Sequence, residues 1–382
     1  MSKKVIVTGC TGQAGSLMVE YLLKNTDYEI YGMVRRLSVN NHKNIDQLKN
    51  NSRFHLFSGD LTDGPSLQKS VDEIKPDFYI NAAAQSFVAE SWISPVGTFQ
   101  SDAVAIIYIL EAIRKFVPNC RFINFASSEM FGDTQYSPQD INHPFRSRSP
   151  YAAAKVAAHQ IVKVYRESYN LYCLSAICFN YEGKNRGLEF ITRKISNGVA
   201  RIYHAIQNNQ NFEPIFVGNI ESKRDWSNAE DIVDGIWMML NQEKYRKMLM
   251  SSIALPLFIK EYILASGETN SVKEFIEASF REAGIVKYRS QKEAVIDNNH
   301  AYWAEWVGQD ELAQYLLYKD DGNVISFRCL VAIDRKFYRP NEVNELCGDS
   351  TPIRNDLGWN PKSTFDNLVK EMVSHDIAVF NQ

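Results

Sequence analysis

The sequence predicts an α/β protein in which a doubly wound parallel sheet carries helices on both faces and is joined to a smaller α/β lobe. Short apolar runs alternate with amphipathic helical segments through the first half of the chain, and a glycine-rich turn follows the first run. Beyond about residue 180 this alternation loosens, and no Pro-rich linker or charge block separates the two regions. We therefore expect the lobe to be interleaved with the sheet domain.

The composition is that of an ordinary folded protein. The 382 residues suffice for about two or three domains of roughly 150 residues, and 45% of them are hydrophobic while 23% are charged. A net charge of −3 gives no bulk attraction to nucleic acid or to an anionic membrane, so neither is expected as a partner. No signal-peptide pattern and no apolar run near the roughly 18 residues of a membrane span is found, which predicts a cytoplasmic protein. The six cysteines include no C-x-x-C pair, so neither a metal site nor a disulfide framework is expected.

The expected elements of the sheet domain alternate along the chain. Mostly apolar runs are typical of strands buried on both faces, and apolar residues spaced three and four apart are typical of amphipathic helices. The expected strands are 5–8, 29–34, 54–58, 78–82, 122–126 and 174–178, and the expected helices are 16–24, 67–74, 104–116 and 151–169. Further helices are expected at 190–206, 231–240 and 272–282.

A G-x-x-G-x-x-G motif comes directly after the first expected strand and opens the first helix. Gly9 allows the tight turn, Gly12 lets the backbone approach a pyrophosphate, and Gly15 lets helix and strand pack closely. The helix N-terminus then faces the anion. This context favours a dinucleotide site over a merely structural turn. The cofactor contacts expected in this loop are Gly9, Thr11, Gly12, Gln13, Ala14 and Gly15.

Residues at the ends of the next strands indicate which cofactor binds. Where an NAD enzyme usually has Asp or Glu, this chain has Arg35 and Arg36, followed by Ser38. Two guanidinium groups suit a 2′-phosphate, which predicts NADP, although an Arg pair exposed to solvent at a strand end is the alternative. Further cofactor contacts are expected at Asp60 and Leu61 for the adenine, and at Ala82, Ala83, Ala84, Gln85 and Ser86 for the middle of the cofactor.

These patterns divide the chain at about residue 180. Residues 1–180 are expected to form an NADP-binding domain of the Rossmann type, with parts of 217–270 returning to it. Residues 181–382 mainly form the substrate-binding lobe. Two segments, 245–263 and 291–328, fall outside the pattern, and we interpret them as packing insertions or oligomer contacts.

A Tyr-x-x-x-Lys pair places its two side chains on one face of a helix. There the ammonium group lowers the pKa of the phenol, and the phenolate accepts a hydroxyl proton during hydride transfer. The sequence contains three such pairs, Tyr151/Lys155, Tyr288/Lys292 and Tyr315/Lys319. Only the first lies on an expected helix of the dinucleotide-binding half, after the strand that ends at Ser127, so it is the candidate catalytic pair.

With these motifs the chain resembles the extended short-chain dehydrogenase/reductase superfamily. More narrowly, Ser127-Ser128-Glu129-Met130-Phe131-Gly132 is similar to the Thr-Ser-Glu-Leu-Tyr-Gly of GDP-mannose 4,6-dehydratases. The likeness extends over 146–151, 165–169, 190–194, 224–226 and 338–343, and covers nearly the whole chain apart from the two insertions.

The resemblance implies NADP-dependent 4,6-dehydration of a GDP-sugar to a GDP-4-keto-6-deoxy sugar, by a homodimer or homotetramer. It implies that Ser127 hydrogen-bonds the C4 oxygen, that Tyr151 is the base at the C4 hydroxyl, and that Lys155 orients the cofactor ribose and tunes Tyr151. A dehydratase needs a further acid/base for the C5 proton and the C6 hydroxyl, and the resemblance assigns that role to Glu129.

The resemblance also implies the remaining ligands. Substrate contacts are expected at Ser86, Ser128, Glu129, Asn180, Arg193, Lys194, Arg224, Arg339 and Glu342, and further cofactor contacts at Tyr181 and Arg186. The chain departs from the family at Phe87 and Tyr181, where the family has His, and at Gly97, where it usually has Tyr. The sugar therefore stays open. A nucleotide-sugar epimerase, a 4-ketoreductase and an inactive NADP-binding regulatory subunit are the alternative functions.

Overall fold

Seven parallel strands form the central sheet of the computed structural model, which describes residues 2–36, 42–246, 259–285, 317–319, 327–338 and 341–380. The strand order is β11-β6-β5-β4-β1-β2-β3. The strands are β1 (Lys4–Thr8), β2 (Glu29–Val34), β3 (Phe54–Ser58), β4 (Phe78–Asn81), β5 (Arg121–Ser127), β6 (Cys173–Cys178) and β11 (Tyr262–Leu264). The chain runs outward from β1 to β3 and then crosses back to β4, so ligands are expected at the carboxyl ends of β1 and β4. The predicted doubly wound parallel sheet is confirmed.

The seventh strand corrects one expectation. Tyr262–Leu264 pairs with β6 in parallel, although 245–263 was interpreted as an insertion. A three-residue strand is too short to show a periodic pattern, so its pairing with β6 could not be read locally. Residues 247–258 of that segment, and most of 291–328, lie outside the described residues.

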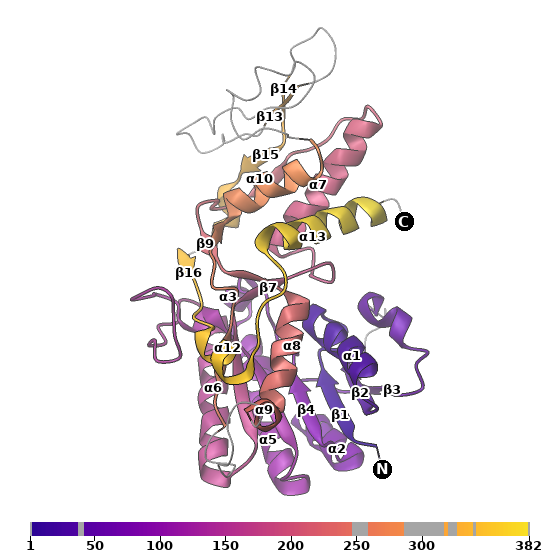
Figure 1. Ribbon diagram of the computed structural model, residues 1–382, viewed down its shortest axis with the longest axis vertical. Coiled ribbons are helices and arrows are strands. Elements are labelled where there is room, and N and C mark those ends of the chain that lie inside the picture. Colours follow the sequence, from indigo (N-terminus) through magenta and orange to yellow (C-terminus); the bar gives the residue numbers. More distant parts are fainter. Residues whose placement is uncertain are drawn as a thin grey trace. The chain divides into compact units, whose positions relative to one another are not determined.

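Helices cover both faces of the sheet (Figure 1). One core contains Val5 and Val7 of β1, and the other contains Ile6, because alternate residues of a strand point to opposite faces. The first core is covered by α1 (Gln13–Asn25), α8 (Ala229–Leu240) and α12 (Thr351–Leu357), and the second by α2 (Gly64–Ile74), α5 (Ala105–Phe116) and α6 (Pro150–Tyr169).

Shorter elements connect these layers. They are the 3₁₀ turns η1 (Lys43–Leu48) and η3 (Ser128–Met130), α3 (Glu90–Ile93), α4 (Pro95–Phe99), the π-helical turn η2 (Gln100–Val104), β7 (Asn180–Glu182), β10 (Trp226–Asn228), α9 (Gln242–Arg246) and β16 (Glu345–Leu346). The turn η2 joins α4 to α5 without a break.

The segment from α4 to α5 bears on the expectation that no apolar run approaches the length of a membrane span. Pro95–Phe116 is a 22-residue helical stretch that contains an 18-residue window with a mean hydropathy of 1.4, so it is long and apolar enough to cross a membrane by length and composition. The expectation of no such segment considered uninterrupted apolar runs, whereas a window average tolerates polar residues such as Asp102. Half of the window is buried inside the protein, and α5 packs into the second core. Such burial is ordinary for a core helix.

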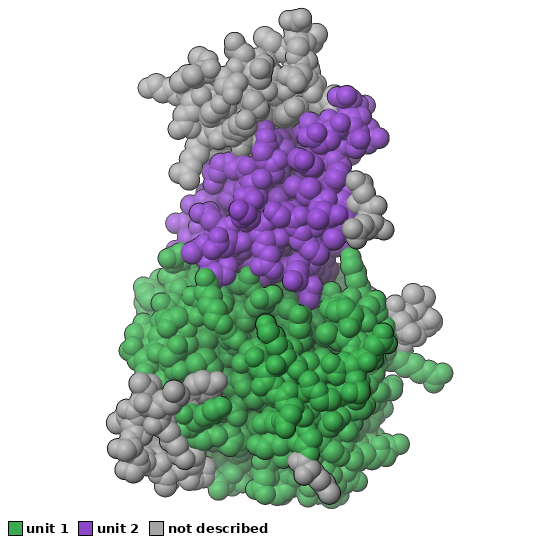
Figure 2. Space-filling model, turned by 45° about the vertical axis from the view of Figure 1, so that its right-hand side comes forward, with its two compact units in different colours: residues 1–181, 225–268, 346–362 green, residues 182–224, 269–345, 363–382 purple. Residues whose placement is uncertain are grey.

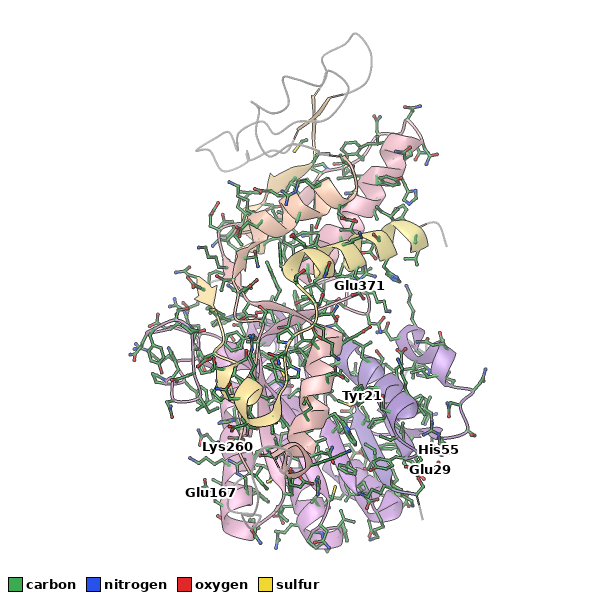
Figure 3. The ribbon with its side chains drawn as sticks, viewed as in Figure 1. Tyr21, Glu29, His55, Glu167, Lys260 and Glu371 are labelled. Atoms are coloured by element: carbon green, nitrogen blue, oxygen red, sulfur yellow. The ribbon has the colours of Figure 1, made fainter. Side chains whose placement is uncertain are left out.

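A polar pair fastens the edge strand β3. His55 Nε2 lies 2.7 Å from Glu29 Oε2 on the neighbouring strand (Figure 3), and the His55 ring lies 5.0 Å from that of Tyr31. This side-chain contact joins the edge strand β3 to β2 in addition to their parallel backbone pairing.

The chain divides into two compact units, which Figure 2 distinguishes by colour. Unit 1 contains 1–181, 225–268 and 346–362, and unit 2 contains 182–224, 269–345 and 363–382. Residues 346–362 fall within 181–382, which we expected to form mainly the lobe, because the short helix α12 carries no local sign that it packs into the first core.

The described residues of unit 2 form three α-helices and small sheets. The helices are α7 (Ile191–Gln207), α10 (Val272–Glu282) and α13 (Phe365–Val379). Paired strands are β8 (Ile215–Val217) with β15 (Val331–Ile333), β9 (Lys223–Arg224) with β12 (Asn270–Ser271), and β13 (Leu317–Lys319) with β14 (Phe327–Cys329), and η4 (Arg335–Phe337) follows β15. Expected helices at 190–206 and 272–282 correspond to α7 and α10.

A buried carboxylate ties three segments of unit 1 together. Asp225 is fully buried, and its Oδ1 accepts hydrogen bonds from the amide and the hydroxyl of Ser266, at 2.8 and 2.6 Å. Its Oδ2 accepts from the amides of Gly267 and Gly348, at 2.9 and 3.1 Å. The segments that follow β11 and precede α12 are thereby fixed to the start of β10.

We expect Asp225→Ala to lower the free energy of unfolding by about 3 kcal/mol or more, because buried donors lose their acceptor. Urea denaturation followed by circular dichroism measures this change. The matched control is Asp72→Ala on α2, where the carboxylate is about half exposed (49%) and the expected change is within about 0.5 kcal/mol. Equal changes in the two variants would contradict the structural role of Asp225.

Candidate active site

The glycine-rich loop after β1 leaves no room for a side chain at Gly9 or at Gly15. Gly9 has φ +68°, and a Cβ there would lie 2.8 Å from the amide nitrogen of Ala83. A Cβ on Gly15 would lie 2.1 Å from the carbonyl oxygen of Gly9. The helix α1 begins at Gln13, with Gly12 as its N-cap, so its first amides point out of the loop. This bare backbone at a helix N-terminus fits the pyrophosphate of a dinucleotide.

We expect Gly15→Ala to weaken dinucleotide binding at least about ten-fold, because the added methyl group must push Gly9 and the start of α1 apart. Calorimetric titration with NADP measures the dissociation constant. The control is Gly284→Ala in unit 2, where nothing lies within 4 Å of the added Cβ although φ is +69°. Full-strength NADP binding by the Gly15 variant would contradict a close approach of ligand to this loop.

The residues expected around the adenosine end lie after β2 and β3. Arg35 and Arg36 follow β2 and are exposed. Hydrogen bonds from the backbone and hydroxyl of Thr62, together with the charge of Arg35, lower the pKa of Asp60. Leu61 is buried, and Ser38 lies outside the described residues. The structure thus brings Arg35 near Asp60.

Hydrogen bonds among polar side chains of β1, β4 and β5 hold the loop that follows β4. The Thr8 hydroxyl donates to Asn81 Oδ1 at 2.7 Å, and Asn81 Nδ2 donates to Asn124 Oδ1 at 2.9 Å. The amide of Ala83 donates to the Thr8 hydroxyl oxygen at 3.2 Å. These hydrogen bonds fix the expected cofactor contacts Ala82, Ala83 and Ala84 relative to the glycine-rich loop, while Ser86 beyond them is exposed.

The candidate catalytic pair lies at the start of α6. Ser149 caps this helix by accepting a hydrogen bond from the amide of Ala152 at 3.1 Å, and Pro150 occupies the first turn. Tyr151 and Lys155 follow one turn apart, and both are buried. The Lys155 ammonium donates to the carbonyl oxygen of Phe125 on β5 at 3.0 Å, and Tyr151 is hydrogen-bonded to Ser127.

Burial shifts both members of the pair away from their charged forms. It raises the pKa of Tyr151, which Asp102 raises further and the hydrogen bond with Ser127 lowers. Burial lowers the pKa of Lys155, and the charge of Asp102 opposes that change. A positive charge beside the hydroxyl of Tyr151 would favour ionisation of this phenol.

Glu129 follows Ser127 on the turn η3. Its backbone amide donates to the Ser127 hydroxyl at 3.2 Å, and the residue is 8% exposed. The charge of Glu129 also influences Tyr151. The structure thus brings Ser127, Glu129, Tyr151 and Lys155 together, with Ser128 buried between the first two.

Sequence reasoning missed Asp102. This carboxylate is 2% exposed, and Gln85 donates its backbone amide to Oδ1 at 2.7 Å. A single acidic residue ahead of the apolar run 103–110 is the signal that could have drawn attention to it.

In unit 2, Arg224 and Glu342 form an ion pair at 3.0 Å. The ammonium of Lys194 lies 3.4 Å from the centroid of the Phe337 ring, and burial, together with the charge of Lys336, lowers its pKa to about 8. Three of the expected substrate contacts therefore lie in this unit with charged or aromatic neighbours, whereas Arg339 lies outside the described residues.

Other expected ligands make contacts that maintain the fold. Arg193 is 5% exposed; its guanidinium pairs with buried Asp376 of α13, and its Nε donates to the Lys184 carbonyl at 3.1 Å. The guanidinium of Arg186 lies 3.5 Å from the centroid of the Phe190 ring and its Nε lies 3.1 Å from Glu182. A substrate or cofactor role for these arginines stays a prediction.

Two further expected contacts lie on β7. Asn180 is partly buried, and its side-chain oxygen has no hydrogen-bond partner within the described part of the chain. The carbonyl of Tyr181 accepts from Gln13 Nε2 at 2.9 Å, which joins this residue to the first turn of α1.

The family model described as GDP-mannose 4,6 dehydratase matches residues 6–372. The chain belongs to this family. The GDP-mannose 4,6 dehydratase of Drosophila melanogaster is 38% identical to it, with 100% of this chain and 87% of that protein covered. The Homo sapiens enzyme of the same name is 36% identical, with 98% and 91% covered.

Solved structures share the fold of this family member at low identity. UDP-glucose 4-epimerase from Thermus thermophilus in complex with NAD has a TM-score of 0.71 and 19% identity, with 98% of this chain and 99% of that chain covered. RMD from Pseudomonas aeruginosa complexed with NADPH has a TM-score of 0.68 and 18% identity, with 99% of both chains covered.

Proposed function

We propose that this member of the GDP-mannose 4,6-dehydratase family is an NADP-dependent hydro-lyase that converts GDP-mannose, or a close GDP-sugar relative, to the GDP-4-keto-6-deoxy sugar. The observation that carries the proposal is the position of Glu129, which follows Ser127 on η3 and whose charge acts on Tyr151. Its carboxyl group can supply the acid/base group that a 4-epimerase does not need. The family match supports it.

The first half of the reaction is oxidation at C4 of the sugar. Tyr151 accepts the proton of the C4 hydroxyl, and the Ser127 hydroxyl hydrogen-bonds the same oxygen. Lys155, held by the Phe125 carbonyl, contributes the positive charge that stabilises the phenolate. A bound nicotinamide would supply the redox chemistry, taking the hydride from C4 and returning it at C6.

The second half is elimination of water. The C4 ketone makes the C5 proton acidic, and Glu129 removes it and delivers a proton to the C6 hydroxyl, so that the C–O bond breaks and water leaves. Hydride returns to C6, and Tyr151 gives its proton to C5. The sugar thus loses one water and the cofactor ends as it began.

The exposed pair Arg35 and Arg36 supports NADP over NAD. Solved relatives of the fold bind NAD or NADPH, which supports a nicotinamide cofactor without choosing between them. Charge-assisted hydrogen bonds to the 2′-phosphate should make NADP bind about ten-fold or more tightly than NAD. Calorimetric titration with the two cofactors tests this, and equal affinities would contradict it.

The substrate assignment rests on the relatives' names and on the charged side chains of unit 2. Lys194 and the Arg224–Glu342 pair suit a nucleotide diphosphate with its ribose hydroxyls. The departures at Phe87 and Tyr181, where the family has His, change the shape and polarity near the sugar and cofactor, so the substrate panel includes GDP-hexoses and GDP-heptoses other than GDP-mannose.

The test is incubation of the purified protein with NADP and this panel, and in parallel with NADPH and a GDP-4-keto-6-deoxy sugar, followed by mass spectrometry of the products and absorbance of NADPH. A 4-keto product lighter by one water supports the proposal. An isomer of unchanged mass indicates an epimerase, net consumption of NADPH indicates a 4-ketoreductase, and binding without any product indicates a regulatory subunit. Each of these three outcomes overturns the dehydratase assignment.

We also propose a cytoplasmic homodimer or homotetramer with no nucleic-acid or membrane partner. Apolar side chains exposed on neighbouring helices of unit 1 support self-association, among them Ile93 of α3, Val96 of α4, and Ile107 and Tyr108 of α5. Light scattering during size-exclusion chromatography measures the mass in solution, and a monomer would contradict this part of the proposal.

A further inference from the structure

Asp102 is a carboxyl group in the interior of unit 1. It lies on the π-helical turn η2, between α4 and α5, and is 2% exposed. Burying a carboxylate is costly unless charges or hydrogen bonds compensate it, and π-helical turns occur often at functional sites. The position of this acid therefore requires an explanation that core packing does not provide.

Within the described residues, hydrogen bonds to Asp102 reach one of its two oxygens. Oδ1 accepts from the backbone amide of Gln85 at 2.7 Å and from the Ser101 hydroxyl at 2.6 Å. Oδ2 has no hydrogen-bond partner in the part of the chain that the structure describes. Because Gln85 belongs to the loop expected along the cofactor, the carboxylate anchors that loop.

The other side of Asp102 meets the catalytic helix. The turn η2 packs against α6, which carries Tyr151 and Lys155. The charge of Asp102 acts on both of these side chains. The other titratable groups that influence the pair are Glu129 on η3, Cys178 on β6 and Tyr181 after it, and these are acids, so Lys155 is the cation of this set.

We propose that Asp102 is a positioning residue of the reaction, which supplies the buried counter-charge of Lys155 and anchors the cofactor-side loop through Gln85. The inference rests on the proposed function, since it concerns the groups that ionise in that reaction. It assigns to η2 a role in setting the pH range of activity.

The sign of the effect follows from the charges. A nearby anion stabilises protonated groups, so Asp102 raises the pKa of Tyr151 and that of Lys155. Removing its charge lowers both. Tyr151 loses its proton on the acid limb of the pH profile, and Lys155 loses its proton on the basic limb. Both limbs should then move in the same direction.

The test is the pH profile of kcat/KM for Asp102→Asn, which retains an acceptor for the Gln85 amide and removes the charge. We expect both limbs to move to lower pH by about one unit, the size of a charge interaction over several ångströms inside a protein. Limbs that stay in place, in a folded variant, would overturn the proposal.

Two control variants separate charge from packing. Thr98→Val removes the hydroxyl that accepts from Gln85 Nε2 at 3.2 Å and so loosens the same loop without changing charge. It should leave both limbs in place. Asp72→Asn removes an exposed charge on α2 and should also leave them in place. A limb shift in Thr98→Val as large as in Asp102→Asn would show that packing causes it.

A second readout does not depend on turnover. The dissociation constant of NADP is measured by titration at each pH across the same range. The pH at the midpoint of its change should be lower in Asp102→Asn than in the wild type. If the wild type binds NADP but converts no GDP-sugar, the proposed function fails while this titration still tests Asp102. An unmoved midpoint would contradict the inference even with activity intact.

A stability comparison covers the case in which Asp102→Asn folds poorly. If Asp102 and Lys155 are buried counter-charges, Lys155→Met leaves an unpaired carboxylate, and adding Asp102→Asn removes it. The double variant should melt at a higher temperature than Lys155→Met alone. A double variant that melts at a lower temperature, as two independent losses would produce, overturns the pairing.

Discussion

Glu129→Gln is expected to lower the rate of 4-keto-6-deoxy product formation about a thousand-fold, because the amide can neither remove the C5 proton nor protonate the C6 hydroxyl. In the proposed reaction, oxidation at C4 precedes this step and uses Ser127, Tyr151 and Lys155, which the substitution leaves in place. We therefore expect the variant to accumulate, during a single turnover, reduced nicotinamide and the 4-keto sugar that still carries its C6 hydroxyl. Stopped-flow absorbance of the reduced cofactor, with mass spectrometry of the quenched sugar, measures both.

The matched control for this variant is Glu111→Gln on α5, which removes a carboxylate that pairs with Arg114 at the surface. Its turnover should stay within about two-fold of the wild type, as for surface changes in general. NADP and GDP should bind Glu129→Gln as they bind the wild type. Normal water loss in Glu129→Gln would remove this residue from the mechanism, whereas lost NADP binding would indicate a damaged fold.

Tyr151→Phe is expected to lower turnover about a thousand-fold or more, because the proton acceptor of the C4 hydroxyl is lost. Oxidation at C4 is then blocked, so reduced nicotinamide should not accumulate, unlike in Glu129→Gln. The two variants thus separate the two halves of the reaction. The measurement is the same single-turnover absorbance trace.

Tyr165→Phe on the same helix is the control. Its hydroxyl donates to Glu111 at 2.8 Å, so the substitution removes a hydrogen bond of α6 far from Ser127. We expect turnover close to that of the wild type. Accumulation of reduced cofactor in Tyr151→Phe would contradict the role of the phenol as the base at C4.

Local patterns in the sequence predict most of unit 1. The strands β2 and β3 have the expected bounds, and α6 begins at Pro150, one residue before the expected start. Apolar runs, glycine spacing and helix caps act over a few residues, which is why they can be read without a structure. The same locality places Tyr151, Lys155 and Ser127 near one another, through the strand–helix order of a doubly wound sheet.

Contacts between distant segments account for what the sequence did not predict. The strand β11 is defined by its pairing with β6, and Asp225 by its hydrogen bonds to residues 266, 267 and 348. The burial of Arg193 against Asp376 joins residues 183 positions apart. Asp102 acquires its role from the packing of η2 on α6. None of these pairings leaves a periodic signal in the sequence.

The most direct test of the proposed reaction follows the hydrogen at C4 of the sugar. GDP-mannose deuterated at C4, or the panel member that serves as substrate, is incubated with the wild-type protein and NADP, and the product is analysed by NMR. Internal return of the hydride predicts deuterium at C6 of a 4-keto-6-deoxy sugar, without net formation of NADPH. Deuterium that remains at C4 of an isomer, or that is absent from C6 of the product, would contradict 4,6-dehydration by this protein.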